Sequence, residues 1–420
     1  MYKFLSAFLF IGVLVSSQQQ WSTFSYPPAT QGRYDDVFFL NENLGWAARG
    51  GSGAVFKTTN GGANWTQLSL PNPNNEYYRN IEFLDENIGF LGTLNNSFYK
   101  TTNGGATWQK VQNISPYPEA ICGLDTVGIS TVYGCGAWFQ PAYIIKSTDS
   151  GNTWQFIDMS AYATALVEIL FITENLGFVS GSDDQGAVIL KTLNGGATWT
   201  KIYGSNIPNE YVWKMQILPG TDNMRMFCSI ESVAPNSGKL LKTVDGGATW
   251  ETKNFPDVDV QAVGFVSSTK GWMGGHHTGF HETNDGGETW TNLGIGGSLN
   301  RIFFLSETLA YASGNNIYKM TGSGLSVSVA GDQSVKELKI DVAPNPVTDV
   351  LNVKIHYEHS DHIVIALYDT SGKFLEYILK DDVPGKGIKN YSLKFDYPAG
   401  AYFLNVHSNL GRRSIKIIKK

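Results

Sequence analysis

An eight-residue segment that ends in tryptophan occurs six times in this chain and limits its possible folds more than any other feature. One copy reads TTNGGATW, from Thr101 to Trp108, and the other five keep the pattern of Ser or Thr, then Asn or Asp, Gly and Trp. Successive tryptophans are 43, 46, 45, 51 and 40 residues apart, and they are Trp65, Trp108, Trp154, Trp199, Trp250 and Trp290. A repeat of about 40 to 50 residues is typical of solenoids and propellers, in which each repeat packs against its neighbours.

The residues between these boxes favour β-strands. Runs such as DVFFL and NIEFL, followed by GWAA or GFLG and then by AVFKT or SFYKT, are short, rich in aromatic and β-branched residues, and bounded by Gly or Asn. Such runs are strand signals, and no window has the sustained 3.6-residue apolar spacing of an amphipathic helix. Each repeat is therefore predicted to be a small antiparallel sheet. A closed ring of such sheets leaves few open edges, which favours a propeller.

A second repeated motif sets the predicted number of blades. Segments such as LNENLGWAA at 40–48 and LSETLAYAS at 305–313 each read as a strand, a tight turn and a second strand, and seven such units exist when two degenerate copies are included. The last unit has no box and no fourth strand after Met320. The segment WSTFSYP at 21–27 spaces Trp and Pro as WTQLSLP does at 65–71. We therefore predict a seven-bladed β-propeller in which this N-terminal strand completes the last blade.

The box itself has the composition of a tight turn. An Asn or Asp two residues after Ser or Thr can bond the backbone of its own turn, and the following Gly adopts the positive φ that the turn needs. The copies match Ser/Thr-x-Asp-x-Gly-x-Thr-Trp, so the chain resembles the Asp-box or BNR repeat proteins, among them sialidases, sortilin-type receptors, some xyloglucan hydrolases and the photosystem II assembly factors.

The pairing of boxes with the upstream strand-turn-strand motif resembles the assembly-factor propellers more closely than the sialidases. This resemblance implies that each box lies between the third and fourth strands of a blade, away from the usual ligand face. It also implies a propeller that holds another protein.

Both ends of the chain differ from the repeats. Lys3, a short apolar run and small residues predict a secretory signal peptide at 1–17, and the run is too short for a comfortable membrane span. The propeller is predicted at 18–320, followed by a Gly/Ser-rich linker at 321–337. Residues 338–420 alternate apolar and polar positions in short strands and read as a small Ig-like β-sandwich.

The last domain resembles the type IX secretion C-terminal sorting domain of Bacteroidetes. The resemblance rests on the Ala343 to Pro346 segment, the turn from Leu367 to Gly372, the Pro398 to Gly400 segment and the closing Lys-rich strand. It implies export across the outer membrane, contact with the type IX secretion machinery, and release or attachment at the cell surface. We expect a secreted or surface-attached monomer without a transmembrane segment.

Composition argues against two further classes of protein. The formal net charge of -6 is unfavourable for binding nucleic acid. Three cysteines are too few for a disulfide scaffold. Cys122 and Cys135 flank a predicted hairpin, and the sequence leaves open whether they are bonded. Cys228 is predicted to be a buried thiol.

A ligand site is predicted where the loops that enter the first strand of each blade meet the loops between second and third strands. Aligning the units places aromatic and charged residues there, which suit a protein or glycan ligand. A propeller rim is also polar simply because it contacts water, and the sequence does not separate the two interpretations. The predicted ligand-binding residues are Tyr34, Arg49, Tyr78, Arg79, Trp138, Glu168, Trp213, Lys214, His276, His277 and Arg301.

A secreted glycoside hydrolase is the alternative to a noncatalytic binding module. Glycoside hydrolysis uses a pair of carboxylates, and the sialidase resemblance would add three arginines, although the Arg-Ile-Pro stretch near the start of sialidases is absent. The candidate catalytic residues are Asp35, Asp36, Asp183 and Asp184. The segment HHTGFH at 276–281 has three imidazoles but no acidic partner within it, so it does not predict a metal site. We expect a binding module with no metal and no cofactor.

Overall fold

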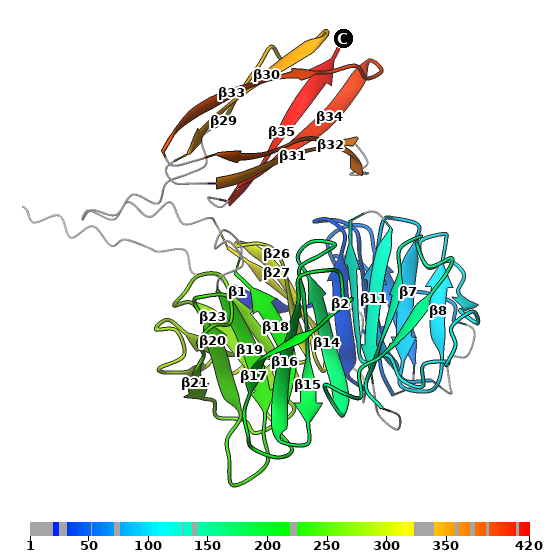
Figure 1. Cartoon of the computed structure of the whole chain (residues 1–420), viewed down its shortest axis with the longest axis vertical. Helices are drawn as coiled ribbons and strands as arrows, with labels where there is room; N and C mark the ends of the chain where they lie inside the picture. Colours follow the sequence, from blue (N-terminus) through cyan, green and yellow to red (C-terminus); the bar gives the residue numbers. More distant parts are fainter. Residues whose placement is uncertain are drawn as a thin grey trace, which may run out of the picture.

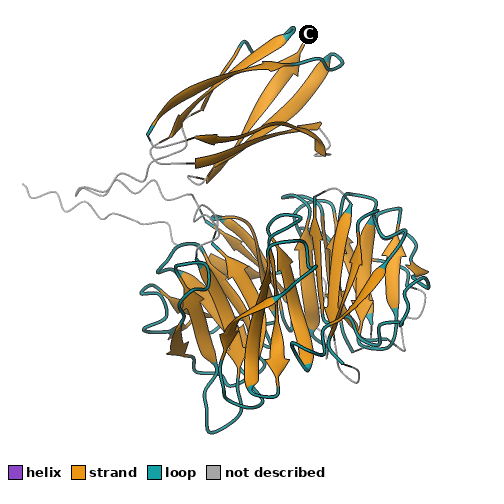
Figure 2. Ribbon diagram, in the orientation of Figure 1, coloured by secondary structure: helices purple, strands orange, loops and turns teal. Residues whose placement is uncertain are grey.

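In the part of the chain that the structure describes, every regular element is a β-strand (Figure 1 and Figure 2). These residues contain no helix with the length and the apolar character of a membrane span. The expected all-β fold is confirmed. The predicted signal peptide and most of the predicted linker lie outside the described residues. The computed structural model describes residues 20–24, 32–51, 53–70, 76–128, 130–136, 141–218, 225–322, 340–357, 361–369, 374–383, 386–408 and 411–420.

Residues 20–322 form seven four-stranded antiparallel sheets, and in six of them the strand order follows the chain. These six are β2 (Tyr34–Phe39), β3 (Gly45–Arg49), β4 (Ala54–Thr58) and β5 (Thr66–Gln67); β6 (Tyr78–Phe83), β7 (Gly89–Thr93), β8 (Phe98–Thr101) and β9 (Gln109–Lys110); β10 (Gly123–Val127), β11 (Thr131–Gly136), β12 (Tyr143–Ser147) and β13 (Gln155–Asp158); β14 (Ala165–Phe171), β15 (Gly177–Asp183), β16 (Gly186–Thr192) and β17 (Thr200–Gly204); β18 (Tyr211–Ile217), β19 (Met226–Glu231), β20 (Lys239–Thr243) and β21 (Glu251–Asn254); and β22 (Val260–Phe265), β23 (Gly271–Gly275), β24 (His281–Thr283) and β25 (Thr291–Asn292). The seventh sheet has the order β1 (Gln20–Thr23), β28 (Ile317–Thr321), β27 (Leu309–Ser313) and β26 (Arg301–Ser306).

The sheets are arranged in a closed ring. Each of the strands β2, β6, β10, β14, β18, β22 and β26 lies beside the corresponding strand of the next sheet, and β26 lies beside β2. We call these seven strands the inner strands. A ring of antiparallel sheets with one strand of each at the centre is the arrangement of a β-propeller.

The chain's first strand joins its last repeat. β1 pairs antiparallel with β28, with Trp21 opposite Met320, and it is the outermost strand of the seventh sheet. The Trp21 side chain is 7% exposed and stacks on Phe280 of the neighbouring sheet with ring centroids 4.3 Å apart. The N-terminal strand therefore occupies the place expected for the missing fourth strand. The apolar packing of Trp21 holds it there.

Each box forms the turn between the third and fourth strands of its sheet. In the first box the backbone N–H of Gly62 donates to Thr58 Oγ1 at 2.9 Å, and that of Asn64 donates to Asn60 Oδ1 at 2.8 Å. The φ angle of Gly62 is 87°, which a residue with a side chain rarely adopts. The same Gly-to-hydroxyl bond occurs in all six boxes, with lengths of 2.8 to 3.1 Å.

A lysine on the third strand links neighbouring sheets through these boxes. Lys57 donates to the Gly104 carbonyl of the next box at 3.1 Å, and Lys319 donates to Gly61 across the ring closure at 2.9 Å. The remaining lysines of this kind are Lys100, Lys146, Lys191 and Lys242. The sixth sheet has Glu282 at this position, and the sheet that follows it has no box.

Stacked aromatic side chains also join neighbouring sheets. Trp46 on β3 stacks on Phe83 of the next sheet at 3.6 Å between ring centroids, and Tyr311 stacks on Phe39 at 3.5 Å across the closure. Gly45 precedes Trp46, and a Cβ there would come within 2.5 Å of the Phe39 ring. The Leu-Gly-aromatic part of the second motif therefore has two roles, since the Gly accommodates one ring and the aromatic residue packs on the next sheet.

The C-terminal residues form two further antiparallel sheets. One contains β29 (Ile340–Ala343), β30 (Val350–Tyr357) and β33 (Gly387–Lys394), and the other contains β32 (Phe374–Val383), β31 (Asp361–Asp369), β34 (Gly400–Ser408) and β35 (Gly411–Lys419). Buried residues of both sheets, including Val353, Ile365 and Leu404, form a single apolar core. The two sheets therefore pack face to face as a sandwich.

The three cysteines are buried thiols and form no disulfide. Cys135 lies opposite Gly123 in the strand register, and a Cβ on Gly123 would come within 3.0 Å of Cys135 Sγ. Cys122 is one residue earlier, and in extended chain its side chain points to the opposite face of the sheet. This difference of one residue explains why two cysteines that flank a hairpin are not bonded.

Candidate functional site

A cavity of about 340 Å³ lies where the starts of the inner strands meet the loops after the second strands. This is the end of the ring on which the sequence predicts a ligand site. Its wall is formed by seven polar or charged residues and by three residues with apolar or weakly polar side chains. The lining residues are Arg33, Tyr77, Arg79, Leu94, Cys122, Trp213, Glu231, Asp259, Gln261 and His276.

A β-bulge recurs at the start of five inner strands. The pairing of β6 with β7 shifts between Tyr78 and Asn80, which leaves Arg79 as the extra residue, and the same shift leaves Trp213 extra on β18. The other three extra residues are Asp35, Val167 and Gln261. Arg79, Trp213 and Gln261 line the cavity. Bulges change the direction of a side chain, and here a repeated bulge directs residues of different sheets to one place.

Arg79 is the most deeply buried cation of the cavity wall, with 5% of its surface exposed. Its Nη1 donates to Asp35 Oδ1 at 2.7 Å, and its guanidinium carbon lies 5.3 Å from the centre of the Trp213 ring. Its Nη2 has no hydrogen-bond partner among the described residues. A buried N–H group without an acceptor costs about 1 to 3 kcal/mol, so this atom favours a ligand that brings one.

Arg33 connects three parts of the rim. It donates to Asp35 Oδ1 through Nε at 2.9 Å and to Gln261 Oε1 through Nη1 at 3.1 Å. Its Nη1 also lies 2.5 Å from His276 Nε2. Burial lowers the pKa of His276, and the charge of Arg33 lowers it further. A neutral imidazole can accept the hydrogen bond from Arg33 through Nε2, which fixes the ring at the cavity wall.

The cavity also has an acidic side. Gln261 donates to Glu231 Oε2 at 3.0 Å, and burial raises the pKa of Glu231 above its ordinary value. Asp259 Oδ2 lies 2.5 Å from His277 Nε2. Two cations, two carboxyl groups and an indole ring therefore share one small cavity, which suits a ligand with both donors and acceptors.

Further along the inner strands lies a buried ionic cluster. Arg301 pairs with Asp36 at 2.9 Å and with Glu82 at 3.2 Å, and Asp36 Oδ2 also accepts from the Ile81 backbone at 3.0 Å. Burial raises the pKa of Asp125 to about 7, and burial also raises the pKa of Glu82 despite its contact with Arg301. These groups bridge β26, β2 and β6 and therefore tie the ends of the ring together.

The predicted ligand-binding residues fall into several groups. Arg79, Trp213 and His276 line the cavity, as expected from their loops. Lys214 is ion-paired with Glu168, and Arg301 belongs to the ionic cluster. His277 contacts Asp259 at the rim, Arg49 is half-buried over the Phe56 ring, and Trp138 lies outside the described residues.

Two predicted ligand-binding residues have a different environment from the expected one. Tyr34 and Tyr78 have 0% of their surface exposed and belong to apolar cores between sheets. Both are the first residues of their strands and lie directly before the bulged residue. The bulge turns the next side chain toward the cavity, and the tyrosine packs inside instead. Neither tyrosine offers surface to a ligand in this structure.

The four candidate catalytic aspartates do not converge on the cavity. Asp35 and Asp36 are each 1% exposed and are held in ion pairs with arginines. Asp183 pairs with Lys201 at 2.6 Å and closes the β15 to β16 turn, while Asp184 is exposed in that turn. None of these four candidates lines the cavity.

Several cavity residues were not predicted from the sequence. Tyr77, Glu231, Asp259 and Gln261 line the wall, and only Gln261 carries a positional signal, because it aligns with Arg79 and Trp213 as the bulged residue. The 276–281 segment contains no acidic residue, but the fold places acidic side chains from an earlier loop against it. Asp257 and Asp259 lie beside His277, although they precede it by 20 and 18 residues.

Comparisons with known proteins agree with both resemblances. Residues 63–163 match a family model described as "Photosynthesis system II assembly factor YCF48", and residues 341–420 match a "Secretion system C-terminal sorting domain". The residues matched by the first model are similar to YCF48, and the last 80 residues are similar to the sorting domain. Such a tail indicates secretion, or display at the cell surface, through the type IX system.

Individual relatives support the fold of the repeats. The photosystem II assembly lipoprotein Ycf48 of Synechococcus sp. (strain CC9902) is 28% identical over 153 residues, which is 34% of this chain and 40% of the relative's length. The structure of YCF48 bound to D1 peptide superimposes with a TM-score of 0.56 and 17% identity, over 73% of this chain and 95% of that one. An ancestral GH74 enzyme has a TM-score of 0.53 and 14% identity, over 92% of this chain and 62% of that one.

Proposed function

We propose that this chain is an exported, noncatalytic binding protein that holds a segment of another protein in the cavity at the centre of its ring. In this proposal the seven sheets are the blades of one propeller, and the C-terminal sandwich is an Ig-like domain that delivers the propeller through type IX secretion. The observation that carries the proposal is the buried Arg79, whose Nη2 has no acceptor and which lies over Trp213 in the cavity wall.

The cavity wall has the features of a recognition site for a polar, extended ligand. Tryptophan and arginine are the residue types that most often dominate binding energy, particularly in desolvated pockets. Arg79 and Trp213 are 5% and 6% exposed, so both are largely desolvated before any ligand arrives. Their positions are fixed by the bulges and by Asp35, and a preorganised site loses little entropy on binding.

A protein ligand is preferred to a glycan for two reasons. The cavity has cationic and acidic groups side by side, which match the backbone and charged side chains of a peptide better than a neutral sugar. One structure of the same fold is that of YCF48 bound to D1 peptide. At 17% identity that likeness concerns the fold, and it supports the proposal only as an example of what such a ring can hold.

The hydrolase alternative has less support. Three of the four aspartates considered from the sequence are ion-paired, Asp184 is exposed, and none of the four lines the cavity. The carboxyl groups of the cavity, Glu231 and Asp259, are engaged by Gln261 and His277. A general acid and base need to face the bond to be broken, with room for a substrate between them.

Incubation of the full chain with candidate substrates distinguishes the two functions. A random peptide library, sialosides and xyloglucan are each mixed with a molar excess of protein, and the mixture is examined for retained ligand and for products. We expect retention of a subset of peptides and no product from any substrate. Release of products that Asp259→Asn or Glu231→Gln abolishes would instead establish a hydrolase.

A further inference from the structure

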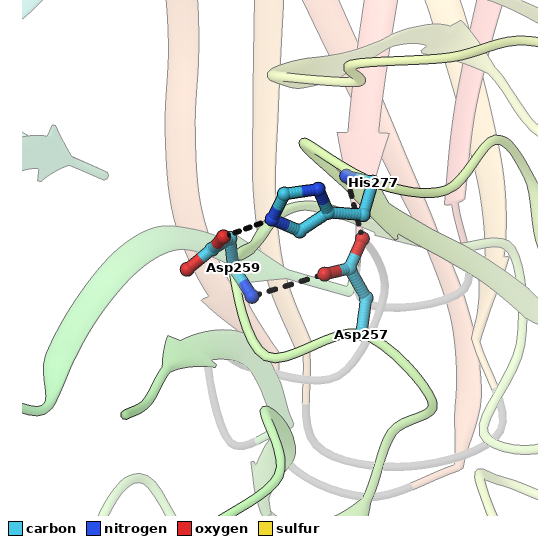
Figure 3. Close-up of side chains that lie close together, drawn as sticks. All are labelled: Asp257, Asp259 and His277. Atoms are coloured by element: carbon cyan, nitrogen blue, oxygen red, sulfur yellow. Dashed lines mark hydrogen bonds and ion pairs between the residues drawn. The ribbon is translucent and has the colours of Figure 1, made fainter. Parts of the chain in front are cut away.

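The fold brings a histidine from one loop against two aspartates from another. Val260 pairs with Gly275, so the loop that precedes β22 lies against the loop that follows β23. Asp257 and Asp259 belong to the first loop and His277 to the second (Figure 3). Each of the three offers one ligand atom, and these atoms all lie within 4.8 Å of one another.

Hydrogen bonds hold both loops in this arrangement. Asp257 Oδ2 accepts from the His277 backbone N–H at 3.0 Å and from Thr278 Oγ1 at 2.8 Å, and Asp257 Oδ1 accepts from the Asp259 N–H at 3.0 Å. The backbone of His276 donates to the Asp259 carbonyl at 3.2 Å. The three side chains are therefore presented by a rigid pair of loops, and a ligand would not need to assemble the site.

Among the described residues, no lysine or arginine forms an ion pair with either aspartate. Asp257 is 3% exposed. The ion-pair partner of Asp259 is His277, whose side chain is 68% exposed. Hydrogen bonds offset part of the cost of burying a carboxylate, and a neighbouring positive charge offsets it further. A bound cation would supply the missing positive charge, and this electrostatic observation is independent of the spacing of the ligand atoms.

We propose that Asp257, Asp259 and His277 bind a divalent transition-metal ion of the Zn²⁺ class. One imidazole nitrogen and two carboxylate oxygens form a ligand set that suits Zn²⁺ better than the oxygen-preferring Mg²⁺ or Ca²⁺. The contact between His277 Nε2 and Asp259 Oδ2 is replaced by two bonds to the metal. Three protein ligands leave a fourth position for water or another donor.

The proposed metal site lies at the edge of the cavity, because Asp259 also lines the cavity wall. The site goes beyond the proposed binding function and does not depend on it. If no peptide binds, Zn²⁺ binding is still expected, and if no Zn²⁺ binds, the cavity keeps Arg79 and Trp213.

Calorimetric titration of the full chain with ZnCl₂ tests the proposal. The protein carries no histidine tag and is treated with EDTA and dialysed before the titration. We expect saturable binding of one Zn²⁺ per chain and a rise in Tm on addition of the metal. His277→Ala and the isosteric Asp259→Asn should each weaken Zn²⁺ binding about tenfold or more, while both apo variants keep the parent circular dichroism spectrum.

His276→Ala is the matched control, because this neighbouring imidazole contacts Arg33 and is not one of the three ligands. Its Zn²⁺ affinity should equal that of the parent chain. The proposal is overturned if the parent shows no saturable binding, if His277→Ala binds as tightly as the parent, or if His276→Ala loses as much affinity as His277→Ala. Displacement of Zn²⁺ by an equal concentration of Mg²⁺ would also contradict the assignment to a transition metal.

Discussion

At the scale of single residues, three of the six boxes contain an aspartate that bonds its own turn through both carboxylate oxygens. Asp245 Oδ1 accepts from Thr243 Oγ1 at 2.7 Å, and its Oδ2 accepts from Thr249 Oγ1 at 2.6 Å. The hydrogen bonds from Thr249 lower the pKa of Asp245 to about 2, and equivalent bonds have the same effect on Asp149 and Asp285. The other three boxes have Asn, as at Asn103, where the amide group donates to Thr107 at 2.9 Å.

The aspartate boxes predict a specific loss of stability in acid. In the unfolded chain an aspartate has a pKa of about 3.9, so the folded state binds fewer protons between about pH 4 and pH 2. The stabilisation is complete above that window and is lost as the pH falls through the folded value. Replacing Asp149, Asp245 and Asp285 together with Asn keeps the turn acceptors and removes the titration. Thermal unfolding at several pH values should show a steeper acid loss of Tm for the parent.

The exposed Asp184 provides a control for this experiment, because Asp184→Asn changes an aspartate outside the boxes. The control should show the same pH dependence as the parent. Identical acid profiles for the parent and the triple variant would mean that the box hydrogen bonds do not depend on the carboxylate charge.

At the scale of elements, the sheets are joined by the third-strand lysines, by stacked aromatic rings and by the shared seventh sheet. Lys146 donates to the Gly195 carbonyl at 2.8 Å and lies 5.2 Å from the centre of the Tyr133 ring. Lys146→Met keeps most of the aliphatic stem and removes the donor, which should lower the free energy of unfolding by about 1 to 2 kcal/mol. Urea unfolding of the full chain measures this change.

Lys253→Met is the control for the lysine experiment. Lys253 pairs with Glu251 and Glu288, whose side chains are 54% and 55% exposed, and such surface pairs contribute little. An equal decrease in the free energy of unfolding for the two variants would show that the contact between a lysine and the next box stabilises the fold no more than an exposed ion pair does.

The closure of the ring depends on Trp21. Trp21→Ala removes a nearly buried indole that stacks on Phe280 and meets Trp272 edge-on at 5.9 Å, and it should destabilise the ring by about 3 to 5 kcal/mol. Urea titration gives the free energy of unfolding of each variant. Trp21→Phe keeps an aromatic ring and should recover more than half of the stability that Trp21→Ala loses. If Trp21→Ala unfolds at the same urea concentration as the parent, β1 is not a structural part of the seventh sheet.

At the scale of the whole molecule, the ring and the C-terminal sandwich have separate apolar cores. Removal of residues 338–420 should therefore leave the thermal unfolding of the ring within a few degrees of its value in the full chain. The truncated protein should stay in the periplasm of its host, because the tail carries the sorting match. Cell fractionation with an antibody to the ring checks this, and normal appearance of the truncated protein outside the cell would refute the sorting role.

Local features of the molecule were predictable from the sequence, and most features that join distant segments were not. Every hydrogen bond within a box lies inside eight residues, so the turn could be inferred from composition. Aligning the repeats placed Arg79 and Trp213 at the cavity, because both occupy the same position in their sheets. The ion pair of Arg301 with Asp36 joins residues 265 positions apart, and no pattern in either segment indicates it. Glu231 ends β19 and Asp259 lies just before β22, next to loops whose lengths differ between repeats. Aligning the repeats therefore could not place these two residues at the cavity.

The affinity of a selected peptide for two arginine variants tests the central claim most directly. A peptide retained from the random library is titrated into the parent chain, into Arg79→Met and into Arg225→Met, a control at the opposite end of the strands, where the chain enters β19. If the cavity at the ring centre is the binding site, Arg79→Met should weaken binding about tenfold or more, because an acceptor group of the peptide loses the buried Nη2 donor of Arg79. Arg225→Met should bind like the parent. Equal affinity of the parent and Arg79→Met, with both chains folded, would contradict a binding site at the ring centre.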